Sequence, residues 1–232
     1  MNRPRPTPDQ PSRRHPVTVA DAEQALYLDV EGLVGEVPCL LGVRFGRRGP
    51  TAQFVLDPQL VAMGDYRSPS ITWSVRVVDP VELFRRLRED VLRDGLRVFA
   101  WSRREADAMG DLLAEDPDLA AFWGDYVENA IPHAKAWKRR HHALVEFPKD
   151  DRGGRHRLER YEWLLGIHRA PVHGGGLTTK RIRSVRRGLA RHGSADLLTR
   201  TQKGHWTKLL VHNELDCAGL AAVVARVAED RP

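Results

Sequence analysis

Leu26-Tyr27-Leu28-Asp29-Val30-Glu31 is the stretch that decides the fold. It is an apolar run with strand character that ends in two carboxylates separated by one residue. Residues two apart in a β-strand lie on the same face of the sheet, so we expect Asp29 and Glu31 to point in the same direction. Two such carboxylates can bind a divalent metal ion together. Acidic residues are also common where a strand runs into a turn, so the interpretation depends on partners elsewhere in the chain.

Candidate partners lie near the C-terminus, in a segment that is predicted to form one helix. His212 and Asp216 are four residues apart in this segment, so their side chains lie one above the other. A His and an Asp at this spacing are often an ordinary surface pair, but together with Asp29 and Glu31 they favour a metal site. The apolar residues of the segment recur with the helical period and predict a buried stripe; they are Leu209, Leu210, Leu220, Val223, Val224 and Val227.

These motifs resemble those of the DEDD exonucleases of the ribonuclease H-like superfamily. Asp29-x-Glu31 matches their first motif. The run His212-Asn213-Glu214-Leu215-Asp216-Cys217 is similar to the Tyr-Asn-x-x-Asp-Cys third motif of the predicted nuclease domains of the YprB and RecB-associated type. The stretch from Leu158 to Arg169 resembles the Leu-x-x-Leu-Glu-x-x-Leu-Gly-Ile-x-Arg segment of the same group. The likeness runs in patches from about residue 25 to 225.

The second motif departs from the family pattern. The family carries a third carboxylate on a helix just after the fourth strand, in a His-Asn-x-x-Phe-Asp context that this chain lacks. Residues 97–101 are expected to form that strand, and Phe99 to Glu105 matches the Tyr-x-x-x-x-x-Glu spacing of some predicted relatives. Glu105 is therefore the implied third carboxylate, with Asp107 as the reserve candidate. The alternative is that both acids only favour a helix N-terminus through the helix dipole.

The resemblance implies a metal-dependent nuclease, expected to be a 3′ to 5′ exonuclease that hydrolyses phosphodiester bonds with two Mg²⁺ or Mn²⁺ ions. The implied catalytic metal ligands are Asp29, Glu31, Glu105 and Asp216, since hard ions prefer carboxylate oxygens. His212 is implied to orient or deprotonate the attacking water, although family members with His usually have four residues before the Asp and this chain has three. The competing interpretation is a catalytically impaired nucleic-acid-binding or scaffold module on the same fold.

Basic residues are concentrated in one part of the chain. Residues 131–200 hold 17 Lys and Arg against 6 Asp and Glu, whereas the whole chain has a net charge of +6. Residues 178–193 are predicted to form one helix with three apolar residues inward and six cations outward. Such a surface attracts the phosphates of DNA or RNA, although a charged helix face is often simply solvated. The predicted nucleic-acid-binding residues are Lys180, Arg181, Arg183, Arg186 and Arg187.

Composition and patterning predict one α/β domain in a soluble, cytoplasmic protein. The expected fold class is a ribonuclease H-like mixed sheet flanked by helices, with a helix-rich C-terminal half. Residues 1–18 are expected to be a disordered basic tail, and 19–232 a single nuclease domain in which 130–195 form a basic helical elaboration. Two cysteines provide neither a disulfide framework nor a metal-thiolate pattern. No apolar run reaches the roughly 20 residues of a membrane span.

The positions of several elements follow from local signals. Residues 25–31, 40–46 and 51–56 are predicted to form an antiparallel meander, because short strand-like runs alternate with turns rich in Gly and Pro. A helix is predicted to begin after Asp79, its N-cap, and to end near Gly95. An additional edge strand is predicted within 71–77, and a short strand near Tyr126 to Glu128. From residue 105 onward the chain is expected to be mostly helical.

Overall fold

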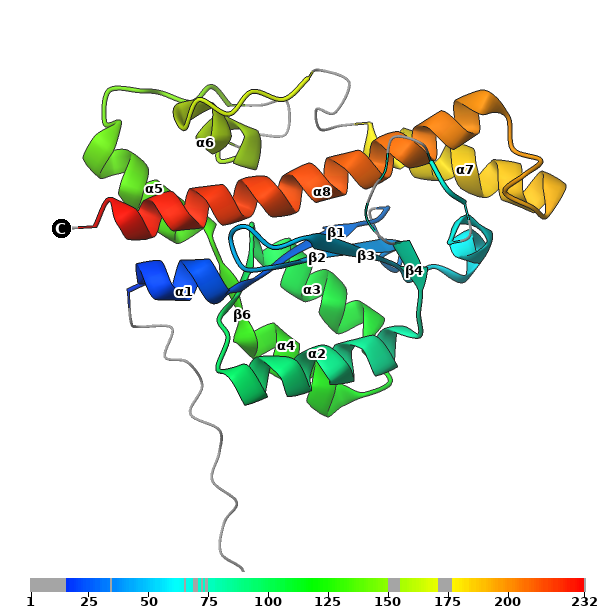
Figure 1. The fold of residues 1–232 in the computed structure, drawn as a ribbon, viewed down its shortest axis with the longest axis horizontal. Coiled ribbons are helices and arrows are strands. Elements are labelled where there is room, and N and C mark those ends of the chain that lie inside the picture. Colours follow the sequence, from blue (N-terminus) through cyan, green and yellow to red (C-terminus); the bar gives the residue numbers. More distant parts are fainter. Residues whose placement is uncertain are drawn as a thin grey trace, which may run out of the picture.

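The computed structural model describes residues 16–33, 35–64, 66–68, 71, 73, 75–149, 155–170 and 177–231. Over these ranges the chain forms a six-stranded mixed sheet flanked by helices, and its C-terminal half is mostly helical (Figure 1). The predicted α/β fold class is therefore confirmed. Most of the predicted tail, up to residue 15, lies outside the described residues. Of its last three residues, Val17 is buried and Thr18 is the N-cap of the first helix.

The sheet combines an antiparallel meander with parallel strands. Its strands are β1 (Leu26–Glu31), β2 (Leu40–Phe45), β3 (Thr51–Val55), β4 (Val75–Val77), β5 (Val98–Ala100) and β6 (Val127–Asn129), in the order β4-β3-β2-β1-β5-β6. β1, β2 and β3 pair antiparallel as predicted. β5 is parallel to β1, β6 to β5, and β4 to β3. The carboxyl ends of β1 and β5 therefore meet at the same end of the sheet.

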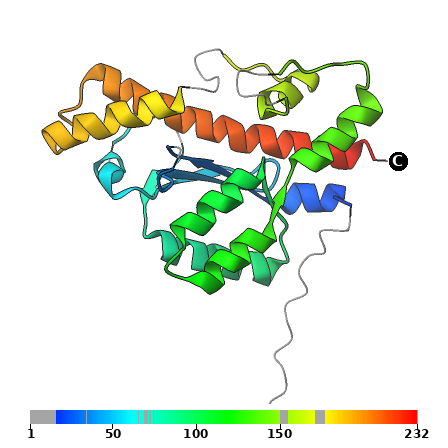
Figure 2. The ribbon, with the colours of Figure 1, turned by 180° about the vertical axis from the view of Figure 1, so that it is seen from behind.

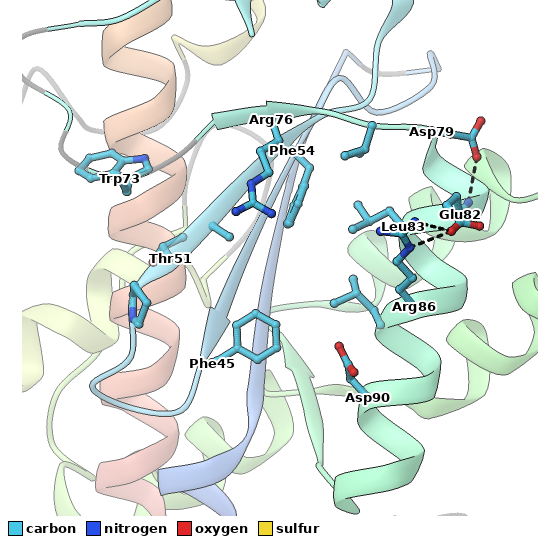
Figure 3. A pocket seen from close by; sticks show the side chains of 14 residues that line it. Phe45, Thr51, Phe54, Trp73, Arg76, Asp79, Glu82, Leu83, Arg86 and Asp90 are labelled. Carbon is cyan, nitrogen blue, oxygen red and sulfur yellow. Dashed lines mark hydrogen bonds and ion pairs between the residues drawn. The ribbon is translucent and has the colours of Figure 1, made fainter. Parts of the chain in front are cut away.

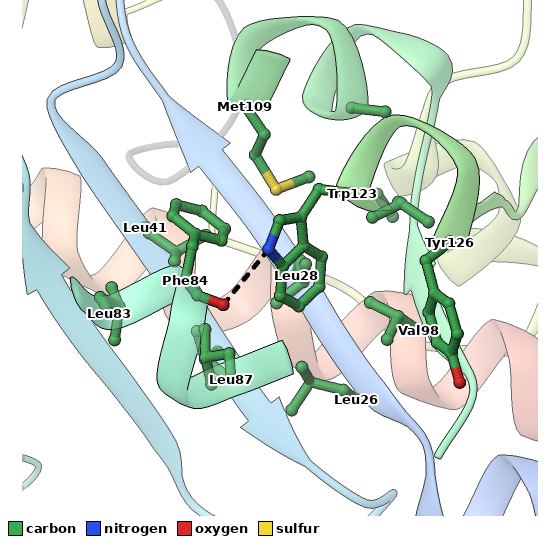
Figure 4. Close-up of a cluster of buried hydrophobic side chains, with 14 of the residues drawn as sticks. Leu26, Leu28, Leu41, Leu83, Phe84, Leu87, Val98, Met109, Trp123 and Tyr126 are labelled. Carbon is green, nitrogen blue, oxygen red and sulfur yellow. Dashed lines mark hydrogen bonds between the residues drawn. The ribbon is translucent and has the colours of Figure 1, made fainter. Parts of the chain in front are cut away.

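One face of the sheet is covered by α2 (Pro80–Asp94), α3 (Arg103–Leu112) and α4 (Pro117–Tyr126), as Figures 1 and 2 show. Figure 4 shows the core beneath them, where Leu26 and Leu28 of β1 meet Phe84 and Trp123. The indole N–H of Trp123 donates to the carbonyl of Phe84 at 3.3 Å, which satisfies a buried donor. The helix α2 begins and ends as predicted, because Asp79 caps it and the left-handed Gly95 terminates it.

The other face is crossed by the thirty-residue helix α8 (Arg200–Glu229), which contacts β1, β2 and β3 (Figure 1). All six residues of its predicted apolar stripe are buried. The helices α1 (Val19–Gln24), α5 (Ile131–His141), α6 (Leu158–Leu164) and α7 (Thr178–His192) contact α8, and the 3₁₀ helix η1 (Pro58–Met63) contacts α7. The predicted basic elaboration therefore consists of helices that pack along α8.

The two faces of β1 decide where its acids point. Leu26 and Leu28 belong to the core under α2, α3 and α4, whereas Tyr27 packs in the core shared with α8. Because side chains alternate along a strand, Asp29 and Glu31 lie on the same side as Tyr27. They therefore face α8, the helix that carries the third motif.

Among the helices that the structure describes, none combines the length and the apolar character needed to cross a membrane.

Candidate metal centre

Four carboxylates predicted from the sequence come together at the carboxyl end of β1. Asp29 and Glu31 lie on β1, Glu105 lies in the first turn of α3, and Asp216 lies in the middle of α8. Their charges act on one another, since Asp216, Glu31 and Glu105 each raise the pKa of Asp29. The strand order explains the meeting, because α3 starts just after β5, the parallel neighbour of β1. The predicted convergence is found; the roles of these residues stay predictions.

His212 lies close to two of these acids. Its Nε2 atom is 3.6 Å from Glu31 Oε1 and 3.5 Å from Asp216 Oδ2. One ligand atom from each of the three residues lies within 4.8 Å of the others. Glu31 and His212 are buried, whereas Asp216 is half-buried. Carboxylate oxygens and an imidazole nitrogen together make a donor set that suits a divalent metal ion.

Asp29 is held by a chain of hydrogen bonds between side chains of the sheet and of α8. The Nδ2 atom of Asn213 donates to Asp29 Oδ2 at 2.7 Å and to the Asp29 carbonyl at 3.1 Å. Gln53 Nε2 donates in turn to Asn213 Oδ1 at 2.8 Å, and the indole N–H of Trp73 donates to Gln53 Oε1. Gly42 pairs with Asp29 in the sheet and makes this contact possible, because a Cβ there would lie 2.4 Å from Asn213 Oδ1.

Asp216 is held by a buried arginine. The guanidinium of Arg169, whose side chain is 7% exposed, donates to Asp216 Oδ1 and to Glu162 Oε1. Gly219 on α8 leaves the space that the Glu162 carboxylate occupies, because a Cβ at that position would lie 1.6 Å from Glu162 Oε1. One oxygen of Asp216 is thus committed to Arg169, while Oδ2 is the atom near His212.

Of the two candidates for the third carboxylate, Glu105 lies beside the cluster and Asp107 does not. Glu105 Oε2 accepts from the backbone N–H and the hydroxyl of Ser102, at 3.0 and 2.7 Å, and forms a capping box. The helix-terminus interpretation therefore holds for Glu105. The charge of Asp216 also contributes to raising the pKa of the same carboxyl. Asp107 is 65% exposed and pairs with Arg103 at 3.4 Å, so the reserve candidate does not face the cluster.

Burial and mutual repulsion make these acids hard to ionise. Burial is the largest cause of the raised pKa in each case, and it raises the pKa of Glu31 to about 8, helped by the charge of Asp216. The same causes hold the pKa of Asp29 well above its ordinary value. A bound cation would relieve this repulsion, so the electrostatics favour cation binding. The acids with a raised pKa are Asp29, Glu31, Glu105 and Asp216.

A pocket of about 340 Å³ opens beside the acids. Glu31 and Glu105 line it, together with Arg104 and with Thr178 and Thr179 in the first turn of α7. The side chain of Thr178 also hydrogen-bonds the Glu31 carboxylate. The pocket gives Glu31 and Glu105 an opening to solvent through which a ligand can reach them.

A larger pocket of about 680 Å³ lies between α2 and the edge of the sheet at β3 and β4 (Figure 3). Phe54 and Trp73 give it an apolar wall, and Glu82 and Arg86 of α2 contribute charge. None of the site residues predicted from the sequence lines it. It is therefore separate from the acidic cluster. Trp73 nevertheless links the two, because its indole N–H donates the first hydrogen bond of the chain that ends at Asp29.

The basic helix α7 differs from its prediction. Lys180, Arg183 and Arg187 are exposed as expected. The expectation that all six cations face outward is wrong for Arg181, which is 3% exposed and whose charge lowers the pKa of Glu31. Arg186 donates to Asp57 Oδ2 at 2.7 Å and to Glu36, so its charge is already paired within the protein. The three predicted inward residues, Ile182, Val185 and Leu189, are buried.

Four residues that support the cluster have no predicted role in the sequence: Gln53, Glu162, Arg169 and Asn213. Glu162, Arg169 and Asn213 lie inside the motifs that carry the family resemblance, so a signal for them is present in the sequence. Gln53 is one polar residue in a buried strand, and nothing in its neighbourhood marks it.

No protein-family model matches the chain, and no curated protein is significantly similar to it. The likeness to DEDD exonucleases therefore rests on the motifs of this sequence, and membership of that family stays a prediction.

Proposed function

We propose that this protein is a metal-dependent nuclease of the DEDD ribonuclease H-like type that hydrolyses phosphodiester bonds of DNA or RNA as a 3′ to 5′ exonuclease. The observation that carries the proposal is the convergence of four carboxylates from β1, α3 and α8 beside an open pocket. Glu31 Oε1 supports a cation there, because this buried atom has no hydrogen-bond partner among the described residues. A lone buried carboxylate oxygen is costly unless it is compensated.

The four carboxylates would hold two Mg²⁺ or Mn²⁺ ions, since oxygen donors suit both. When bound, such ions supply the Lewis acidity that activates water and stabilises the leaving oxygen in phosphodiester hydrolysis. The residues around the ligands position them in advance. Asn213 fixes the carboxylate of Asp29, and Arg169 fixes that of Asp216. Outer contacts of this kind orient metal ligands and tune their affinity. The ligands are Asp29, Glu31, Glu105 and Asp216.

The substrate would approach along α7. The first turn of this helix lines the pocket through Thr178 and Thr179. The exposed cations Lys180, Arg183 and Arg187 follow at spacings of three and four residues, so they form one stripe that starts near the pocket. Phosphates of a nucleic-acid strand are attracted to such a stripe without regard to sequence.

A cytoplasmic location is part of the proposal. Cys39 and Cys217 are both buried free thiols, the state that a reducing compartment maintains.

The second candidate is a nucleic-acid-binding or scaffold module without catalysis. It is favoured by the internal contacts of two of the acids, because Asp216 is paired with Arg169 and Glu105 caps α3. Both acids thus have structural roles that require no metal. In this alternative the cluster holds α8 and α3 to the end of the sheet, and α7 alone contacts nucleic acid.

Digestion of end-labelled oligonucleotides separates the two candidates. The EDTA-treated protein is incubated with single- and double-stranded DNA and RNA in the presence of Mg²⁺, Mn²⁺ or EDTA. We expect metal-dependent release of mononucleotides from the 3′ end, which a 5′ label reports as a ladder. Asp29→Asn should abolish cleavage, whereas Asp107→Asn, which neutralises an exposed acid on α3, should retain it. Oligonucleotide binding without cleavage by the wild-type protein would favour the module.

A further inference from the structure

His212 is enclosed by protein. Its side chain is 7% exposed, and it does not line the pocket in which Glu31 and Glu105 appear. A general base has to reach the proton that it removes, directly or through one water molecule. The enclosed position of the ring favours a role toward its immediate neighbours over a role toward bulk water or substrate.

The distances around His212 fit a shared metal ion better than hydrogen bonds. Its Nε2 atom is 3.6 Å from Glu31 Oε1 and 3.5 Å from Asp216 Oδ2, beyond the usual N–H···O range of about 2.7 to 3.2 Å. Two ligand atoms that each lie about 2.1 Å from one ion in a tetrahedral arrangement are about 3.4 Å apart. His212 therefore stands at ligand-like separations from both acids, and the two acids lie within 4.8 Å of each other.

The surroundings leave the facing oxygens available. Arg169 binds Asp216 Oδ1, so Oδ2 is the oxygen near the imidazole. Glu31 Oε1, the atom nearest to Nε2 on the other side, is buried and has no hydrogen-bond partner among the described residues. Glu31 as a whole is 8% exposed. A buried carboxylate oxygen that faces an imidazole beyond hydrogen-bond distance is the arrangement expected of two ligands of one cation.

We propose that His212 is a direct ligand, with Glu31 and Asp216, of one divalent ion, and that this site prefers a transition-metal ion such as Mn²⁺ or Co²⁺ to Mg²⁺. The inference rests on the metal centre of the proposed function and names its metal preference. Carboxylate and water oxygens suit Mg²⁺, whereas an imidazole nitrogen suits transition metals, whose affinity for such a site rises from Mn²⁺ to Co²⁺.

Calorimetric titration of the EDTA-treated protein with Mg²⁺, Mn²⁺ and Co²⁺ tests the preference. The wild type should bind Mn²⁺ and Co²⁺ at least about tenfold more tightly than Mg²⁺. His212→Ala should lower the Mn²⁺ affinity by about 10- to 100-fold and change the Mg²⁺ affinity by less than about threefold. His192→Ala removes an exposed imidazole at the end of α7 and should leave all three affinities unchanged.

Electron spin-echo spectroscopy of Mn²⁺ bound to the wild type tests the ligand without any variant. We expect the spin echo of Mn²⁺ to be modulated by the nitrogen nuclei of a coordinated imidazole. Mn²⁺ binding without that modulation, or equal affinity in His212→Ala, overturns the inference even if oligonucleotides are cleaved. Nitrogen modulation without cleavage supports the ligand assignment and contradicts the nuclease proposal. Failure of the wild type to bind any of the three ions overturns both.

Discussion

Glu31→Gln should make the stability of the metal-free protein less sensitive to pH. Burial, and then the charge of Asp216, raise the pKa of Glu31 in the folded state from 4.5 to about 8. The folded state therefore binds this proton more tightly than the unfolded state does. The resulting stabilisation is fully present below about pH 4.5 and is lost as the pH rises through about 8. Glutamine mimics the protonated acid and does not titrate.

The size of the effect follows from the two pKa values. The gap between 4.5 and about 8, at about 1.4 kcal/mol per pKa unit, amounts to on the order of 5 kcal/mol. In a domain of this length 1 kcal/mol changes Tm by about 2 to 4 °C. The Tm of Glu31→Gln should thus equal that of the wild type near pH 4.5 and exceed it by about 10 to 20 °C above pH 8.

Differential scanning fluorimetry in EDTA between pH 4.5 and pH 9 measures the difference. Glu89→Gln makes the same chemical change at an exposed position on α2, and its Tm should follow that of the wild type at every pH. Added Mn²⁺ should raise the Tm of the wild type above pH 7 and have little effect on Glu31→Gln. Parallel curves of Tm against pH for the wild type and Glu31→Gln would refute this prediction. They would mean that folding does not raise the pKa of Glu31.

Three further variants address the site and its surroundings. Asp216→Asn keeps the shape of the side chain but removes a charge proposed to hold a divalent ion, so cleavage should fall to background and calorimetric Mn²⁺ affinity should drop by at least about tenfold. Gly219→Ala places a Cβ 1.6 Å from Glu162 Oε1 and should lower the free energy of unfolding in urea by about 1 to 3 kcal/mol. Gly204→Ala, with open space on the same helix, should not destabilise. Reversing Arg183 and Arg187 to Glu should weaken binding to all oligonucleotides alike and reduce the slope of log Kd against log salt by about two; unchanged affinity would show that this stripe is only solvated.

The parts of the fold that were predicted correctly have strong local signals. The alternation of β1 placed Asp29 and Glu31 on one face, and the pair Asp79 and Gly95 marked both ends of α2. The apolar period of α8 identified its buried stripe, and with it the side that carries Asp216. In each case neighbouring residues in the chain determine the structure, so the sequence is sufficient.

The parts that escaped prediction depend on tertiary packing. Arg181 is buried because α7 packs against both α8 and η1, which makes its inward face wider than the apolar residues alone indicate. Gln53 reaches Asn213 across the interface between β3 and α8, a contact 160 residues apart in the chain. No local pattern in the sequence marks either the burial of Arg181 or the contact of Gln53 with Asn213.

The length of chain between β1 and α8 also restricts when the site can exist. Asp29 is synthesised early and Asp216 late, and Asn213, whose amide holds Asp29, lies 184 positions after it in the chain. A chain is synthesised from its N-terminus, so β1, β2 and β5 can pair while α8 is still missing. Until α8 docks, the acids of β1 lack both their fixing amide and their third-motif partners. The proposed metal centre therefore cannot assemble until α8 has been made, because α8 supplies both core packing and the proposed ligand Asp216.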